Sequence, residues 1–228
     1  MKIKIVAEIG INHFGRVKLL NEYLKKLDNK KIDALSIQIL NKNKTKKEFK
    51  KYCLNKTEIQ NFFKKAKKKF KMVGVAIHSW DDFKFLKKIK LDFIKILGSS
   101  FGDYNYLKKV KSLKTSKIFL STGGKSITQV RNFLKIVKDN KITILFTFFN
   151  TKNFANEIKT IEIMKKKFKN EVAYGNHYKN IFEIPKICKY KPSEIFLYIK
   201  MNSRGKFPDN EHAVPLSKLN ILVKKING

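Results

Sequence analysis

The chain has 228 residues, of which 43% are hydrophobic, so it can bury one sizeable core. It contains no apolar run of 18 residues and no signal-peptide pattern in MKIKIVAEIG, which argues against a membrane protein and predicts a cytoplasmic location. The formal net charge is +34, yet all but three of the 52 basic residues are lysine rather than arginine, the side chain that base and phosphate readers favour.

The lysines run through nearly every predicted helix instead of forming one stripe. Lys, Asn, Ile and Phe are all abundant, as expected of a protein encoded by an AT-rich genome. Codon bias therefore explains the charge better than a specific nucleic-acid partner does, although a field of this sign attracts RNA and anionic surfaces weakly. Cys53 and Cys188 form neither a metal motif nor a disulfide framework.

Eight short β-rich runs alternate with amphipathic helices along the chain. The runs cover residues 2–10, 34–40, 72–78, 93–100, 117–124, 142–148, 171–177 and 194–202. The clearest helical patterns cover residues 17–27, 57–70, 127–140 and 216–226, and capping boxes are predicted at Thr57 to Gln60 and Ser126 to Gln129. This alternation predicts the α/β class and one (β/α)8 TIM barrel domain over residues 1–228. An open doubly wound sheet is the alternative, but no glycine-rich nucleotide-binding loop accompanies it.

Polar side chains gather where the predicted strands end, which is where barrels of this kind place their active sites. They are Glu8, Asn12, His13, Gln38, His78, Lys95, Ser99, Ser100, Ser121, Thr122, Asn150, Asn176, His177, Lys200 and Asn202. Singly, each has a structural explanation: Gln38 as a satisfied core amide, His78 as a loop residue, and Glu8 as the partner of a lysine such as Lys95. Together they predict one polar rim.

The residues of this rim resemble a known family. AEIGINHFG, residues 7–15, resembles the opening motif AEIGxNHxG of the N-acetylneuraminate (sialic acid) synthases. ALSIQIL, FIKILGSS, IFLSTGG, YGNHY and FPDNEHAVPLSKL are similar to later motifs of that family and occur in the same order. The resemblance therefore spans essentially the whole chain.

The resemblance implies a reaction in surface-carbohydrate biosynthesis. Phosphoenolpyruvate would condense with an N-acetylated amino sugar to give a nonulosonic (sialic-type) acid, and a divalent metal, Mn2+ or Mg2+, would polarise the sugar aldehyde. The implied catalytic residues are Glu8, His177 and Asp209. The implied substrate-binding residues are Gln38, Lys95, Ser99, Ser121 and Asn150. His177 and His212 are the implied metal ligands, and a homodimer is the expected assembly.

Several positions depart from the family pattern. Ser36 stands where the family has a phosphate-binding lysine, and Phe101 stands where it has a glutamate. The family motif Ser-Asp-His is replaced by Gly175-Asn176-His177 in this chain. The eighth strand, LYIKMN, has no histidine at the position of the family's second metal ligand, and the family's tyrosine after strand six is also missing. The family's usual C-terminal antifreeze-like domain does not follow within the 228 residues. Three hypotheses follow: a working synthase, a barrel of the same ancestry that binds a sugar or phosphate without synthase activity, and a basic nucleic-acid-associated protein.

Overall fold

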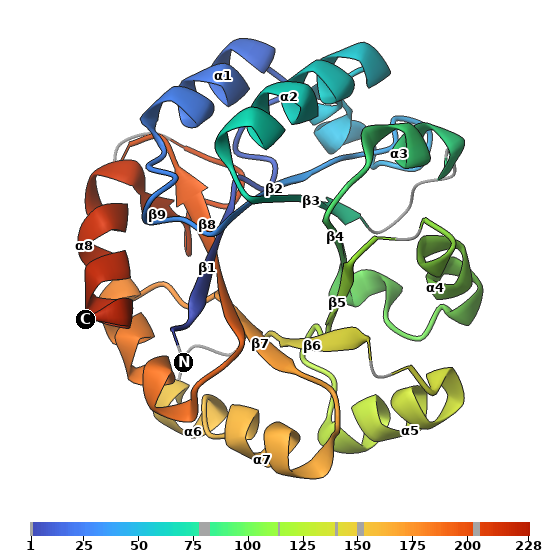
Figure 1. Ribbon diagram of the computed structural model, residues 1–228, viewed down its shortest axis with the longest axis vertical. Helices are drawn as coiled ribbons and strands as arrows, with labels where there is room; N and C mark the ends of the chain where they lie inside the picture. Colours follow the sequence, from blue (N-terminus) through green and yellow to red (C-terminus); the bar gives the residue numbers. More distant parts are fainter. Residues whose placement is uncertain (1, 78–82, 114, 140, 150–152, 203–205) are drawn as a thin grey trace.

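The eight β-rich runs form one closed parallel barrel. The computed structural model describes residues 2–77, 83–113, 115–139, 141–149, 153–202 and 206–228. Strands β1 to β8 pair in chain order, and β8 pairs with β1, which closes the sheet. Figure 1 looks down the barrel and shows the helices arranged around its outside. The predicted (β/α)8 fold is confirmed, and the open sheet is wrong.

The element bounds follow the predicted alternation. The strands are β1 (Lys4–Glu8), β2 (Ala34–Gln38), β3 (Met72–Ile77), β4 (Phe93–Ile96), β5 (Lys117–Ser121), β6 (Ile142–Phe146), β7 (Val172–Gly175), β8 (Glu194–Lys200) and β9 (Val214–Pro215). The α-helices are α1 (Val17–Lys26), α2 (Lys56–Lys69), α3 (Phe83–Ile89), α4 (Tyr104–Lys111), α5 (Ile127–Val137), α6 (Phe154–Glu157), α7 (Thr160–Lys167) and α8 (Leu216–Asn227). The 3-10 helices are η1 (Lys47–Tyr52), η2 (Gly98–Ser100) and η3 (Ile181–Tyr190). The short β9, which the sequence did not predict, pairs with β8 outside the ring.

Side-chain caps fix where two helices begin. At α5, Gln129 N donates to Ser126 Oγ at 3.3 Å and Ser126 N donates to Gln129 Oε1 at 2.9 Å, which confirms the predicted capping box. At α2 the predicted box, Thr57 to Gln60, is wrong by two residues. Asn55 and Glu58 form it instead, through two hydrogen bonds of 2.8 Å. Asparagine is at least as good a cap as threonine, so the helix begins at Lys56 and Thr57 lies in its first turn.

The lysines are spread around the barrel as predicted. Basic side chains occupy the last turn of α1, α2, α3, α4, α5, α7 and α8. A cation there complements the negative end of the helix dipole. These helices encircle the sheet (Figure 1), so the lysines form no single stripe along the barrel, but the last turns of all these helices lie at the end of the barrel where the strands begin. No helix in the described ranges is long and apolar enough to cross a membrane.

An apolar layer fills the middle of the barrel and separates two polar layers. Its inward side chains are Val6, Ala34, Phe93, Phe119, Leu145, Ala173 and Phe196. The three phenylalanine rings meet edge to face, with centroids 5.5, 6.0 and 4.9 Å apart. Such contacts add to the free energy of burial and make the middle of the barrel a packed core rather than a channel.

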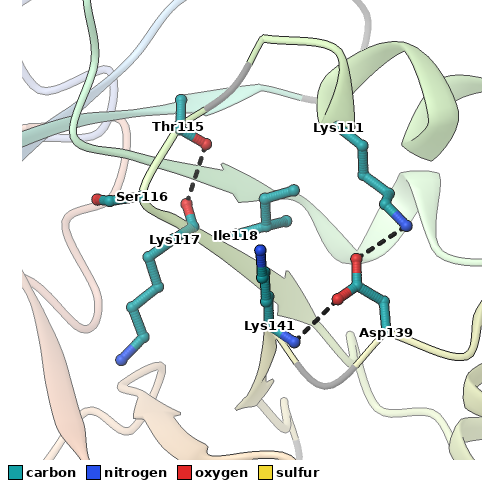
Figure 2. Close-up of a pocket in the computed structure, with 7 residues that line it drawn as sticks. All are labelled: Lys111, Thr115, Ser116, Lys117, Ile118, Asp139 and Lys141. Carbon is teal, nitrogen blue, oxygen red and sulfur yellow. Dashed lines mark hydrogen bonds and ion pairs between the residues drawn. The ribbon is translucent and has the colours of Figure 1, made fainter.

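The polar layer at the N-terminal ends of the strands consists of ion pairs. Lys117 Nζ lies 2.6 Å from both Glu171 Oε2 and Glu194 Oε1. Beside it lies a cavity of about 550 Å3, drawn in Figure 2, where Lys111 Nζ pairs with Asp139 Oδ2 at 2.8 Å. This end of the barrel normally serves stability rather than catalysis, and its paired cations are consistent with that.

Candidate functional site

The polar layer at the opposite end contains a buried ion pair. Lys95 Nζ lies 3.3 Å from Glu8 Oε2 and donates a hydrogen bond to Tyr198 Oη at 3.1 Å. The side chains of Glu8 and Lys95 are 0% and 1% exposed. Burial alone lowers the pKa of Lys95, but Glu8 and Tyr198 outweigh it and raise that pKa above its usual value. Lys95 is therefore a permanently charged ammonium group held by a carboxylate.

Only one oxygen of Glu8 takes part in this pair. Glu8 Oε1 is buried and has no hydrogen-bond partner among the described residues. A buried acceptor without a partner costs about 1–3 kcal/mol. The interpretation of Glu8 as a mere ion-pair partner of Lys95 thus accounts for one of its two carboxylate oxygens. The other oxygen has no partner in the described structure, although Glu8 is fully buried and is not among the residues that line the cavity described next.

A cavity of about 490 Å3 adjoins the ion pair at the C-terminal ends of the strands. Its lining residues are Gln38, Lys95, Leu97, Gly98, Ser99, Ser121, Gly123, Lys125, Phe149, His177 and Tyr198. Five predicted site residues, Gln38, Lys95, Ser99, Ser121 and His177, therefore share one cavity. The predicted Asn150 and the rim residue His78 lie outside the described residues.

Hydroxyl groups line one wall of the cavity. Ser121 Oγ lies 2.9 Å from Thr147 Oγ1, which accepts a hydrogen bond of 2.8 Å from Gly123 N. The β4 and β5 loops touch here, because a Cβ on Gly98 would lie only 2.5 Å from Gly123 Cα. The sequence did not predict Thr147 as a site residue. Thr147 lies two residues after the inward-facing Leu145 of β6, and this spacing predicts that its side chain also faces inward.

His177 and Tyr198 line the other wall, and His212 packs against both of them without being among the cavity's lining residues. The ring centroids of His177 and His212 lie 4.7 Å apart, and Tyr198 lies 5.2 and 4.7 Å from them. Burial, helped by the nearby charges of His212 and Lys95, lowers the pKa of His177 to about 3. Burial likewise lowers the pKa of His212 to about 4. Both rings are therefore neutral near pH 7, the form that binds a metal ion.

These imidazoles suit a divalent metal with few protein ligands. His212 Nε2 is buried and has no hydrogen-bond partner among the described residues. The same residues contain no cluster of three or more His, Cys, Asp or Glu side chains that could hold a metal. The two neighbouring imidazoles are candidate ligands, and the binding of a metal by them stays a prediction.

Asp209 lies behind the cavity, against β1. Its Oδ2 accepts a hydrogen bond of 3.3 Å from Ile11 N, and its own N donates to Asn12 Oδ1 at 2.9 Å. Burial raises the pKa of Asp209 to about 6; the Ile11 hydrogen bond opposes this rise and the charge of Glu8 adds to it. Asp209 is thus electrostatically coupled to Glu8 but is not among the cavity's lining residues, and its contact with substrate stays a prediction.

Gly10 makes room for Asp209 beside the barrel. It has a φ of +58°, and a Cβ there would lie 2.5 Å from Asp209 Oδ2 and 2.9 Å from Tyr198 Cε1. We expect Gly10→Ala to lower the free energy of unfolding by more than the roughly 1–3 kcal/mol of backbone strain alone. Urea denaturation measures this, with Gly102→Ala as the matched control, because Gly102 has a φ of +95° and nothing within 4 Å. Equal losses in the two variants would show that the contact with Asp209 is unimportant.

His13 provides a pH-dependent contribution to stability. Its Nδ1 accepts a hydrogen bond of 3.0 Å from Gly15 N, so its proton resides on Nε2, 3.4 Å from Gln38 O. Burial lowers the pKa of His13 from 6.5 to about 4, so its contribution is present above pH 6.5 and disappears as the pH falls toward 4. The loss is about 3 kcal/mol. Unfolding at pH 7 and 4.5 should show a steeper decline for the wild type than for His13→Gln, and parallel declines would contradict this.

The comparisons with known proteins agree with this geometry. The model of the NeuB family matches residues 10–227. The chain belongs to the NeuB family. This confirms the resemblance drawn from the sequence motifs, although a comparison with curated protein sequences finds no match.

Solved structures share the NeuB-family barrel. An N-acetylneuraminic acid (sialic acid) synthetase from Leptospira borgpetersenii, in complex with citrate, superposes with a TM-score of 0.88 at 19% identity over 99% of this chain and 83% of its own. A spore coat polysaccharide biosynthesis protein from Bacillus subtilis gives 0.80 at 17% identity, over 99% and 67%. A truncated 3-deoxy-D-arabino-heptulosonate 7-phosphate synthase from Thermotoga maritima gives 0.72 at 12% identity, over 98% and 85%. At these identities the likeness shows the fold.

Proposed function

We propose that this NeuB-family chain condenses phosphoenolpyruvate with the aldehyde of an open-chain N-acetylated amino sugar, forming a nonulosonic acid and releasing phosphate. One observation carries the proposal. A buried Glu8–Lys95 pair with an unpartnered carboxylate oxygen adjoins a cavity that also presents two serine hydroxyls and a neutral histidine.

The cavity can hold an anion beside a polar sugar. Lys95 supplies a positive charge to the carboxylate or phosphate of phosphoenolpyruvate, and Ser99 and Ser121 can donate hydrogen bonds to its oxygens. Gln38 offers an amide to the sugar from the end of β2. A divalent metal held by His177 and His212 would polarise the sugar aldehyde as a Lewis acid.

Glu8 would take up a proton in this reaction. In the proposed reaction the methylene carbon of phosphoenolpyruvate bonds to the aldehyde carbon, and the aldehyde oxygen takes up a proton to become a hydroxyl group. Water adds to the resulting cationic carbon with loss of a proton, and phosphate leaves as the new hydroxyl group loses its proton to form the ketone. The added water gives up a proton, and Glu8 Oε1 is an acceptor with no other partner in the described structure. Burial raises the pKa of Asp209 to about 6, so this carboxyl group can hold or release a proton not far below neutral pH.

The direct test is phosphate release from phosphoenolpyruvate and N-acetylmannosamine in the presence of Mn2+. We expect release by the wild type and its loss in both Glu8→Gln and His177→Ala, with calorimetry reporting Mn2+ binding by each protein. Release that persists in both variants would reject the assigned roles.

The small number of candidate metal ligands favours a second function, ligand binding without catalysis. Because the described residues offer no group of three ligands, the barrel is also suited to binding a sugar or phosphate without turnover. A folded wild type that binds no Mn2+ and releases no phosphate with several amino sugars would select this function instead.

A further inference from the structure

The cavity has a second cation that the motifs did not indicate. Lys125 lines it from the loop between β5 and α5, on the same side as Ser121 and Gly123. The loop is held in place, because Lys125 N donates to Thr122 O at 3.0 Å and Gly124 N donates to Thr147 O at 3.0 Å. Ser126, the next residue, caps α5. The base of the Lys125 side chain is therefore fixed at the cavity wall.

Lys125 differs from Lys95 in having no carboxylate partner among the described residues. Lys95 is paired with Glu8 at 3.3 Å, so the pair adds no net charge to the cavity, although the ammonium group can still donate a hydrogen bond to a ligand. No carboxylate of the described residues forms an ion pair with Lys125. Among the lining residues, Lys125 is thus the cation that gives the cavity its net positive charge.

The neighbouring strand β2 supplies no charge in its place. Ser36 pairs in register with Glu8 and is fully buried, and its Oγ has no hydrogen-bond partner in the described structure. Ser36 thus offers a neutral hydroxyl group, whereas a trianionic ligand such as phosphoenolpyruvate is best bound by cations. Lys95, deep in the barrel, and Lys125, at the wall, then stand at two separate places along the cavity.

We propose that Lys125 binds the phosphate group of phosphoenolpyruvate at the β5–α5 wall, while the carboxylate lies toward Lys95. This assignment rests on the proposed function. Ser99 and Ser121 share the cavity with Lys125, and their hydroxyl groups would donate hydrogen bonds to the same phosphate.

Calorimetric titration of phosphoenolpyruvate, inorganic phosphate and pyruvate separates the two ends of the ligand. We expect Lys125→Gln to weaken phosphoenolpyruvate and phosphate binding by about 10- to 100-fold, as for loss of a charge-assisted hydrogen bond. Pyruvate has the carboxylate but no phosphate, so its affinity should not change. Lys125→Arg should restore most of the phosphate affinity, and Lys135→Gln, an exposed lysine on α5, should change none of the three.

The outcomes distinguish this proposal from the function on which it rests. Equal phosphoenolpyruvate affinity in Lys125→Gln and wild type would overturn the role of Lys125 and leave the synthase standing. An equal loss of pyruvate binding would also overturn it, because the effect would then be general charge. Phosphate binding that needs Lys125, in a protein that turns over no amino sugar, would support Lys125 and reject the synthase. A wild type that binds neither phosphoenolpyruvate nor phosphate would overturn both.

Discussion

Replacing Lys95 with methionine is expected to lower the free energy of unfolding by about 3–5 kcal/mol, because it leaves the Glu8 carboxylate buried without its partner. The pair lies 3.3 Å apart with almost no exposure, so water would compensate the carboxylate only poorly after the ammonium group is removed. Urea denaturation at pH 7 measures the loss. Adding Glu8→Gln to Lys95→Met should recover part of it, because the double variant has no uncompensated charge.

The other end of the barrel offers a matched control. Lys117 also pairs with a buried glutamate, Glu194, and with the exposed Glu171, but its own side chain is 16% exposed, compared with 1% for Lys95. Lys117→Met should therefore cost less than Lys95→Met, since water can reach the vacated position. Equal losses, or no recovery in the double variant, would mean that burial of the Glu8–Lys95 pair is not what makes it strong.

The barrel was predictable because its periodicity is local. Each strand is a short apolar run whose inward and outward side chains are both buried, and each helix repeats its apolar residues every three or four positions. The errors have local causes too. The cap of α2 was placed at Thr57 because two good caps, Asn55 and Thr57, lie two residues apart.

The site was predictable only as a set of residues, and their contacts were not. Strand ends placed Glu8, Lys95 and His177 on one rim, but the Tyr198 hydroxyl on Lys95 depends on how β8 closes against β1. The approach of His212 to His177 depends on the loop after β8, where Lys200 Nζ donates to Asn210 Oδ1 at 2.7 Å. Lys125 was missed because one lysine carries little information in a chain so rich in lysine.

Glu8→Gln is expected to separate turnover from binding. The amide cannot accept the proton of the attacking water, so the rate of phosphate release should fall by about 10²–10⁴-fold. The same change removes a negative charge 3.3 Å from Lys95 and leaves that ammonium group to the ligand. Phosphoenolpyruvate should therefore bind at least as tightly as it does to the wild type, and calorimetry with a turnover assay measures both quantities.

Glu194→Gln distinguishes a chemical role of Glu8 from a structural one. Glu194 is likewise a buried glutamate with one oxygen on a lysine, at 2.6 Å, and the other without a partner in the described structure, but it lies at the far end of the barrel. Glu194→Gln should lose some stability, less than Glu8→Gln because Lys117 keeps Glu171 at 2.6 Å, and it should keep its turnover. If both variants lost turnover equally, the effect of Glu8 would follow from folding. If Glu8→Gln bound phosphoenolpyruvate more weakly, Glu8 would contact the bound ligand instead of only accepting the proton of water. Proton transfer follows binding, so its loss alone would not change the affinity.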